Sequence, residues 1–297
     1  AGTYSAGQNV GDPNCEANKG IVIPQASGFR CGFKYGPRFN IVNDEDHDQL
    51  YVSLKTVLAS GVEAKFDYLS ADTEVYDNPQ SPSYPALSYL SPANAILPGK
   101  GGNPFGVPVL WLGRPLASAF PSPFAPREIE MDRVSFGLAG SFDNGFDWNF
   151  DMTRSAEDNY GRQPDTGTSK LAAAIDGRGG PGGNETFNLF DPSANSQELR
   201  DWMRSDQETW TDVVLSVVDF VMSGEVGDVS LAVGAQQRRE KYDISRSENS
   251  IVEFDAAGNL SKPADMIFLG GGTESSASRT TNAVFVEAST DLSDTSF

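Results

Sequence analysis

The sequence predicts an all-β protein, part of an antiparallel, up-and-down transmembrane β-barrel with about seven strands and long external loops. Apolar and polar residues alternate with a period of two along about seven segments. Short turns and long polar loops connect these segments in strict alternation. No apolar run approaches the roughly 20 residues that a transmembrane helix needs, whereas a barrel strand needs only about ten alternating residues.

The clearest predicted hairpin joins residues 133–142 to residues 146–153. The second segment, FDWNFDMT, places four apolar side chains on one face: Phe146, Trp148, Phe150 and Met152. The connection FDNGF contains Asn144-Gly145, a dipeptide that favours tight hairpin turns because both residues tolerate a positive φ. This pattern predicts two antiparallel strands joined by a tight turn.

The same unit of two strands and a short turn recurs twice. One copy joins residues 50–58 to 62–68, and a later copy joins 211–222 to 229–238. The segment 211–222 alternates poorly, because Asp219 falls in its apolar register. We therefore expect a β-bulge in that strand.

A seventh strand is predicted at residues 281–290, and long connections separate each hairpin from the next. These connections cover residues 72–131, 156–209 and 242–280. Structureless loops of this length are unusual in compact soluble domains, but an outer-membrane barrel has short periplasmic turns and long external loops. On pattern alone the alternative is a soluble β-sandwich, whose apolar faces pack against each other.

The barrel hypothesis predicts where the turns and the two kinds of side chain lie. One end of the strands should hold the turns near Gly61, Asn144 and Gly227. The opposite end should hold the loops that contain Trp111, Gly180 and Gly258. The face directed to lipid should carry Phe66, Trp148, Phe150 and Leu231. The inward face, which contacts a plug or solute or forms a hydrated wall, should carry Lys65, Asp147, Asp151 and Arg238.

The formal net charge of −19 argues against nucleic acid as a partner, because phosphate binding needs clustered Lys and Arg. Such a charge suits either a solvated surface or a lumen that attracts cations or metal chelates.

The two cysteines, Cys15 and Cys31, lie in a stretch rich in Gly and Pro. No further Cys and no nearby His offers more metal ligands, so a zinc site is not expected. We predict that the two are bonded to each other in an external loop within an oxidising compartment. The alternative is a pair of free thiols in a cytosolic loop.

No catalytic constellation is found, and neither an enzyme activity nor a cofactor nor a metal is predicted. The one histidine, His47, lies in NDEDHD, where clustered carboxylates suggest calcium. The EF-hand spacing is absent, and a solvated rim above the first strand is favoured. GRGGPGG at 177–183 has no preceding strand and no Gly-Lys-Ser/Thr, so a flexible external loop is favoured over a phosphate-binding loop.

The loop 72–131 is rich in aromatic residues and is the predicted ligand-binding region. Aromatic rings on a loop can stack on a sugar or a flat chelate. The candidate ligand-binding residues are Tyr76, Tyr84, Tyr89, Trp111, Phe120 and Phe124. The alternative is that these side chains pack the loop against its neighbours.

Several short motifs occur in an order that covers nearly the whole chain: DPNC followed by a second Cys, GGNPFG at 101–106, NGFDWNFDMTRSAED, FNLFDP at 187–192, GDVSLAVGAQQRREKYD and TNAVFVEASTDL. Together they resemble the TonB-dependent receptor family, the plugged outer-membrane transporters of Gram-negative bacteria. Each motif is weak alone, and the resemblance lies in their shared order.

The resemblance implies that residues 1–297 are a partial outer-membrane β-barrel domain. The family's plug domain, its coupling segment and the remaining strands of a barrel of about 22 are absent from this chain. The implied function is binding of a scarce nutrient (siderophore, cobalamin or oligosaccharide) at external loops and its import through the barrel. The implied partners are outer-membrane lipid and, through the missing N-terminal part, the TonB energy-coupling complex. The alternative function is a secreted or surface β-sandwich that binds or adheres without transport.

Overall fold

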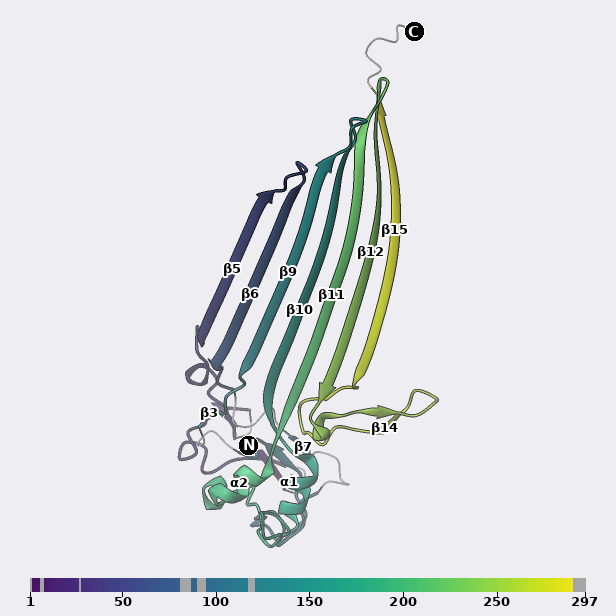
Figure 1. Cartoon of the computed structure of the whole chain (residues 1–297). Helices are drawn as coiled ribbons and strands as arrows, with labels where there is room; N and C mark the ends of the chain where they lie inside the picture. Colours follow the sequence, from purple (N-terminus) through teal and green to yellow (C-terminus); the bar gives the residue numbers. More distant parts are fainter. Residues whose placement is uncertain are drawn as a thin grey trace.

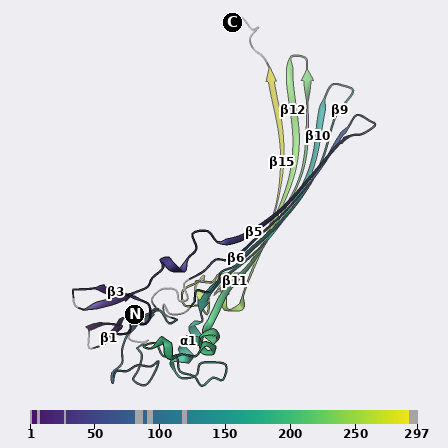
Figure 2. The same cartoon turned by 90° about the vertical axis from the view of Figure 1, so that its left-hand side faces the viewer.

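The computed structural model describes residues 2–5, 8–26, 28–80, 87–89, 95–116 and 121–290. They form a seven-stranded antiparallel sheet and, at one end of its strands, a folded loop region (Figure 1). We define the loop region as the described residues of 2–43, 78–126, 167–203 and 247–274. The sheet is long and curved, and in Figure 2 it rises from the loop region as a nearly edge-on ribbon.

The strands of the sheet follow one another in space in the order in which they occur along the chain. They are β5 (Asp44–Val57), β6 (Glu63–Asp77), β9 (Arg127–Ser141), β10 (Asp147–Thr166), β11 (Arg204–Val226), β12 (Val229–Arg246) and β15 (Ser275–Thr290). Each strand is antiparallel to its neighbour. The prediction of seven strands in an up-and-down order is therefore confirmed, while the sheet itself is open.

The short turns lie at one end of the strands and the long connections at the other, as predicted (Figure 1). Gly61, Gly145 and Gly227 have φ values of 81°, 85° and 62°, a left-handed conformation that glycine adopts without steric cost. This explains why each tight turn contains a glycine.

The strands are longer than the alternation predicted. β10 and β11 have 20 and 23 residues, and most of their added length lies at the loop end. There both faces carry polar residues, so no period of two marks the strand in the sequence.

The predicted bulge at Asp219 is wrong. β11 pairs without a register shift on both sides, and Asp219 lies directly between Asp151 and Gln236. Its carboxylate accepts a hydrogen bond from Gln236 Nε2 at 2.7 Å. The alternation fails because β11 carries valines on both faces, with Val217 and Val221 beside Asp219 on the same face.

The strand register places the two predicted sets of side chains on opposite faces, because directly paired residues project from the same side of a sheet. One row of paired residues contains Ala64, Leu138, Phe150, Phe220, Ala235 and Val284. Phe66, Trp148 and Leu231 share this face by the period of two, which we call the apolar face. Lys65, Asp147, Asp151 and Arg238 lie on the other, which we call the polar face.

The loop region contains short strands and helices. A four-stranded sheet comprises β1 (Gly2–Ser5), β2 (Gln8–Gly11), β7 (Leu87–Tyr89) and β8 (Trp111–Gly113). Two hairpins comprise β3 (Ile21–Pro24) with β4 (Phe29–Gly32), and β13 (Glu253–Phe254) with β14 (Leu260–Lys262). The helices are η1 (Gly36–Arg38), α1 (Thr168–Ile175), η3 (Pro192–Ala194), α2 (Gln197–Met203) and η4 (Glu248–Ser250). Within the described part of the chain, no helix is long and apolar enough to cross a membrane.

The packed apolar core of the protein lies in the loop region. Its buried members include Ile96, Val109, Trp111, Leu171, Phe187, Leu189, Leu199 and Met203. Ser196 directly precedes α2, and its Oγ accepts a hydrogen bond from the Leu199 backbone N–H at 3.0 Å and so caps the helix. The long connections are thus folded rather than structureless.

Asp165 joins this core to the sheet. It is buried near the loop end of β10, and its carboxylate accepts hydrogen bonds from the backbone N–H groups of Thr166, Phe268 and Leu269 at 2.7, 2.9 and 2.7 Å. One side chain therefore fixes the connection between β12 and β15 against the end of β10.

Replacing Phe187, which is fully buried, with Ala should destabilise the loop region by about 3–5 kcal/mol, because the substitution leaves a cavity. Hydrogen exchange of the loop-region amides measures this. The control is Phe254→Ala, which removes a side chain that is 55% exposed and should change stability by about 0.5 kcal/mol or less. Equal protection in both variants would show that the loop region has no core of its own.

Candidate functional site

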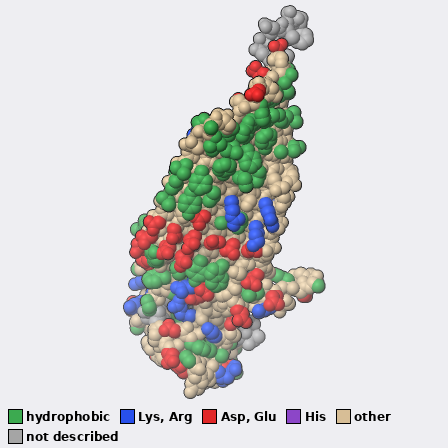
Figure 3. Space-filling model, in the orientation of Figure 1, with side chains coloured by type: hydrophobic (Ala, Val, Ile, Leu, Met, Phe, Trp, Pro, Cys, Tyr) green, Lys and Arg blue, Asp and Glu red, His purple; other side chains and the backbone are tan. Residues whose placement is uncertain are grey.

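The apolar face of the sheet is exposed over most of its area (Figure 3). Large apolar side chains on six strands are 36–85% exposed on this face: Leu50, Val52, Leu54, Phe66, Val134, Phe136, Met152, Phe220, Val284 and Val286. Exposed apolar patches larger than a few hundred Å² are uncommon on soluble proteins and mark a surface that contacts a partner or a membrane.

A row of carboxylates bounds this surface on the side of the loops. The strand register aligns Asp48, Asp72, Glu130, Asp158, Asp212 and Asp243 across six neighbouring strands, on the same face as the apolar side chains. Neighbouring strands lie about 4.8 Å apart, so the row is a nearly continuous line of negative charge. Figure 3 shows acidic side chains gathered below the apolar surface.

The distance between the two ends of the apolar surface can be derived from β12. From Val229 next to the turn to Arg239, the first basic residue of this strand on the apolar face, there are about ten residues, or roughly 33 Å along the strand. At the tilt of about 40° that is usual for membrane barrels, this length spans about 25 Å along the membrane normal. That height equals the apolar band of an outer-membrane barrel.

Aromatic and hydroxyl-bearing side chains mark both ends of this surface. The rings of Phe142 and Trp148 lie 6.1 Å apart at the turn end. Towards the loops, the Tyr68 hydroxyl donates a hydrogen bond to Asp132 at 2.7 Å. Such amphipathic aromatic side chains are favoured where an apolar layer meets water.

The polar face contains hydrogen-bonded and charged groups in place of an apolar surface. The Tyr51 hydroxyl and Lys65 Nζ both lie 2.8 Å from the carboxylate of Asp67. Arg238 and Glu240 form an ion pair at 2.7 Å. This face therefore suits water or a polar partner.

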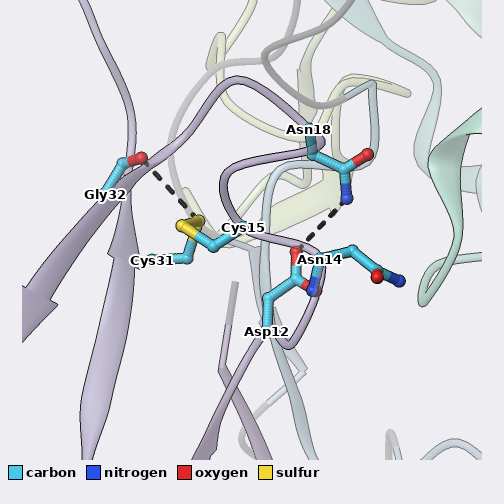
Figure 4. The surroundings of a disulfide bond; sticks show 6 residues. All are labelled: Asp12, Asn14, Cys15, Asn18, Cys31 and Gly32. Carbon is cyan, nitrogen blue, oxygen red and sulfur yellow. Dashed lines mark hydrogen bonds between the residues drawn. A yellow bond between two sulfur atoms is a disulfide. The ribbon is translucent and has the colours of Figure 1, made fainter.

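The predicted disulfide between Cys15 and Cys31 is present, with Cα atoms 5.5 Å apart (Figure 4). It links Cys15, in the turn that follows β2, to Cys31 in β4. Asp12 supports this turn by accepting hydrogen bonds from the Asn14 backbone N–H at 2.9 Å and from Asn18 Nδ2 at 3.4 Å. A Cβ at Gly20 would collide with both sulfur atoms, so the chain can pass against the disulfide only with glycine there.

A pocket of about 480 Å³ opens beside the disulfide. It is lined by Glu16, Lys19, Gly20, Lys34, Pro37 and Arg38. Among the described residues, Lys19 and Lys34 form no ion pair. The pocket is therefore positively charged in a chain whose net charge is −19.

An aromatic cluster adjoins this pocket. The Arg114 guanidinium lies 4.3 Å from the ring centre of Phe33 and 4.8 Å from that of Tyr35, and the Arg38 guanidinium lies 5.4 Å from Phe33. Burial lowers the pKa of both arginines, but guanidinium groups stay charged in proteins. Desolvated cations beside an exposed aromatic ring form a site suited to a flat anion.

The structure describes the side chains of three of the six predicted ligand-binding aromatics, Tyr76, Trp111 and Phe124. Trp111 is 1% exposed and packs in the loop-region core, in accord with the alternative that aromatic side chains pack the loop. Tyr76, whose hydroxyl donates to Glu74, and Phe124 are each 49% exposed. Tyr89 lies in β7, and its side chain is not described. Tyr84 and Phe120 lie outside the described residues.

The basic pocket was missed in the sequence, although a signal was present. Residues 15–38 contain Lys19, Arg30, Lys34 and Arg38 but only Glu16 as an acid, an inversion of the overall charge. The carboxylate row had no such signal, because its members become neighbours only through the strand register.

His47 and its acidic neighbours lie within β5 itself and not above it. The His47 ring contacts Thr73 Oγ1 at 3.0 Å and Glu45 at 3.2 Å. In the described ranges, no group of three or more His, Cys, Asp or Glu side chains is arranged to hold a metal ion.

No protein-family model matches the chain, and no curated protein sequence matches it.

Replacing both Cys15 and Cys31 with Ser should destabilise the segment around the pocket by about 3 kcal/mol, because the bond closes a loop with a sequence separation of 16. The measurement is hydrogen exchange of the amides between residues 12 and 38. Reduction of the disulfide in the wild-type protein should destabilise the segment by the same amount. Unchanged exchange in both cases would show that the disulfide does not stabilise the pocket.

Proposed function

We propose that the chain is part of the barrel of a bacterial outer-membrane receptor of the TonB-dependent type, which binds a scarce nutrient at its external loops and imports it. The sheet, with one apolar and one polar face, supports the membrane part of this proposal. Its apolar face is exposed, has the height of a membrane's apolar layer, and ends at a row of carboxylates. Lipid is the partner that such a surface fits best.

The backbone of the edge strands argues for closure by further strands. Among the described residues, β5 and β15 each pair with a neighbour on one side only. Within a bilayer each unpaired N–H and C=O group costs several kcal/mol, so that membrane-spanning sheets close into barrels. We propose that strands beyond these seven complete the barrel, and that a plug domain faces its polar side.

The sandwich alternative finds no support in the described part of the chain. Apart from Pro164 at the loop end of β10, the buried apolar side chains of the described chain lie outside the seven strands, and no second described sheet packs against the apolar face. A sandwich would bury this face in a closed core.

The loop region supports the receptor part of the proposal. A basic pocket next to exposed aromatic rings lies at the end of the strands that would face outward. Its charge favours a nutrient that carries carboxylate, phosphate or phenolate groups, which includes many metal chelates. The solute would pass from the loops through the barrel with energy supplied by the TonB complex.

Replacing Phe150 with Arg should impair assembly into the outer membrane, because an Arg on the lipid face near the bilayer midplane costs about 2–4 kcal/mol. The matched control is Asn149→Arg, one residue away on the polar face, which should assemble like the wild type. Membrane fractionation and folding in lipid measure both variants. Equal damage at the two positions would contradict the membrane orientation.

Uptake by cells tests the transport claim. Cells that carry the protein should take up one of three radiolabelled probes: ferric siderophore chelates, cobalamin or malto-oligosaccharides. Uptake should stop when the proton gradient is dissipated. The double substitution Lys34→Gln and Arg38→Gln should reduce it, while Lys262→Gln, which changes an exposed cation elsewhere in the loop region, should not. Uptake of none of the probes would contradict the proposal.

A further inference from the structure

Three basic side chains interrupt the apolar face of the sheet. Arg154 of β10 and Arg239 of β12 both pair in register with Ser216 of β11, which lies between them. Lys241 lies two residues further along β12 on the same face. Between the turns and the carboxylate row, the described strands carry no other basic residue on the apolar face.

Arg154 and Arg239 lie at the same position along the strands on the two sides of β11. On β10, Arg154 follows the exposed apolar Met152 and precedes Asp158 of the carboxylate row. On β12, Arg239 and Lys241 follow Ala235 and precede Asp243. The cations therefore lie near the loop end of the apolar surface, two to four residues before the acidic row. Figure 3 shows basic side chains between apolar and acidic side chains on this face.

Arg154 and Arg239 are exposed, and in the described part of the chain neither forms an ion pair. Lys241 is paired with Asp243 at 2.5 Å. Arg154 and Arg239 are two strand spacings apart, or roughly 10 Å. At this separation both long side chains can reach one group that lies between them. The Ser216 hydroxyl lies at the centre and can donate a hydrogen bond to the same group.

Two exposed arginines at the end of an apolar surface fit one kind of partner. Guanidinium groups bind phosphate oxygens in a bidentate manner, and Arg and Lys extend their charged ends from an apolar layer to the headgroup level. Asp158 and Asp243 repel an anion from the loop side, so the anion is confined to the level of the arginines.

We propose that Arg154, Arg239 and Lys241, together with Ser216, bind the phosphate of an anionic lipid headgroup in the leaflet at the loop end of the barrel. This inference rests on the proposed membrane orientation of the sheet. It adds a specific lipid site on the outer surface, distinct from the pocket in the loops.

The test uses the protein extracted from outer membranes in detergent and titrated with diphosphoryl lipid A, with binding measured by native mass spectrometry. The Arg154→Gln/Arg239→Gln variant should bind the lipid roughly 25-fold more weakly than the wild type, because each basic residue at an anionic membrane surface contributes roughly a factor of five. The control Arg133→Gln/Arg238→Gln removes the same charge from the polar face and should bind like the wild type.

Two further arms identify the ligand. Lipid A without its phosphates should bind wild type and variant equally weakly. Inorganic phosphate should not compete at millimolar concentration. Competition by inorganic phosphate would overturn the proposal in favour of a site for a soluble anion.

The proposal also fails if the Arg154→Gln/Arg239→Gln variant binds lipid A as the wild type does. That result leaves the proposed function intact when the protein is recovered from the outer membrane. Recovery of the protein as a soluble species instead refutes the membrane orientation, and the lipid site with it.

Discussion

Backbone hydrogen bonds between neighbouring strands hold the seven-stranded sheet together, since Pro164 at the loop end of β10 is the one buried apolar side chain that its described strands contain. Long ladders such as that from Asp147↔Ser223 to Thr166↔Arg204 supply these bonds without interruption. In water a single sheet with an uncovered apolar face would expose that face and two edges to association. The same arrangement is what a lipid environment requires, because lipid covers the apolar face and forces every backbone group to pair.

The loop region, unlike the sheet, is stabilised by a packed apolar core. Its segments come from distant parts of the chain and share one apolar core around Trp111 and Phe187. The carboxylate of Asp165 joins the loop region to the end of β10, and the disulfide holds the turn after β2 against β4. The basic pocket is thereby held on a folded support, a condition for selective binding by loops.

The sequence predicted the strands where one face is apolar and the other polar, and it failed where this contrast disappears. The segments 133–142 and 146–153 were found because Phe150 and its neighbours alternate with aspartates. β11 was misjudged at Asp219 because valines occupy both of its faces. The helices α1 and α2, with 8 and 7 residues, are too short for their periodicity to distinguish them from loops.

The candidate sites were harder to predict for a related reason. Trp111 was chosen as a surface aromatic, but a core residue and a binding residue have the same sequence signature when the loop fold is unknown. The carboxylate row and the cluster of Arg154 and Arg239 depend on strand register, which brings together residues far apart in the chain. Local patterns contain no information on such neighbours.

The central claim is that the apolar face of the sheet contacts lipid between the turns and the carboxylate row. Nitroxide scanning of β10 tests it most directly, since both native cysteines are bonded and an introduced cysteine is the one reactive thiol. Labels from Trp148 to Ala156 should alternate with a period of two, with even positions accessible to oxygen and odd positions to a water-soluble nickel chelate. From Asp158 onward the nickel chelate should reach every label. Nickel access on both faces along the whole strand would contradict the account.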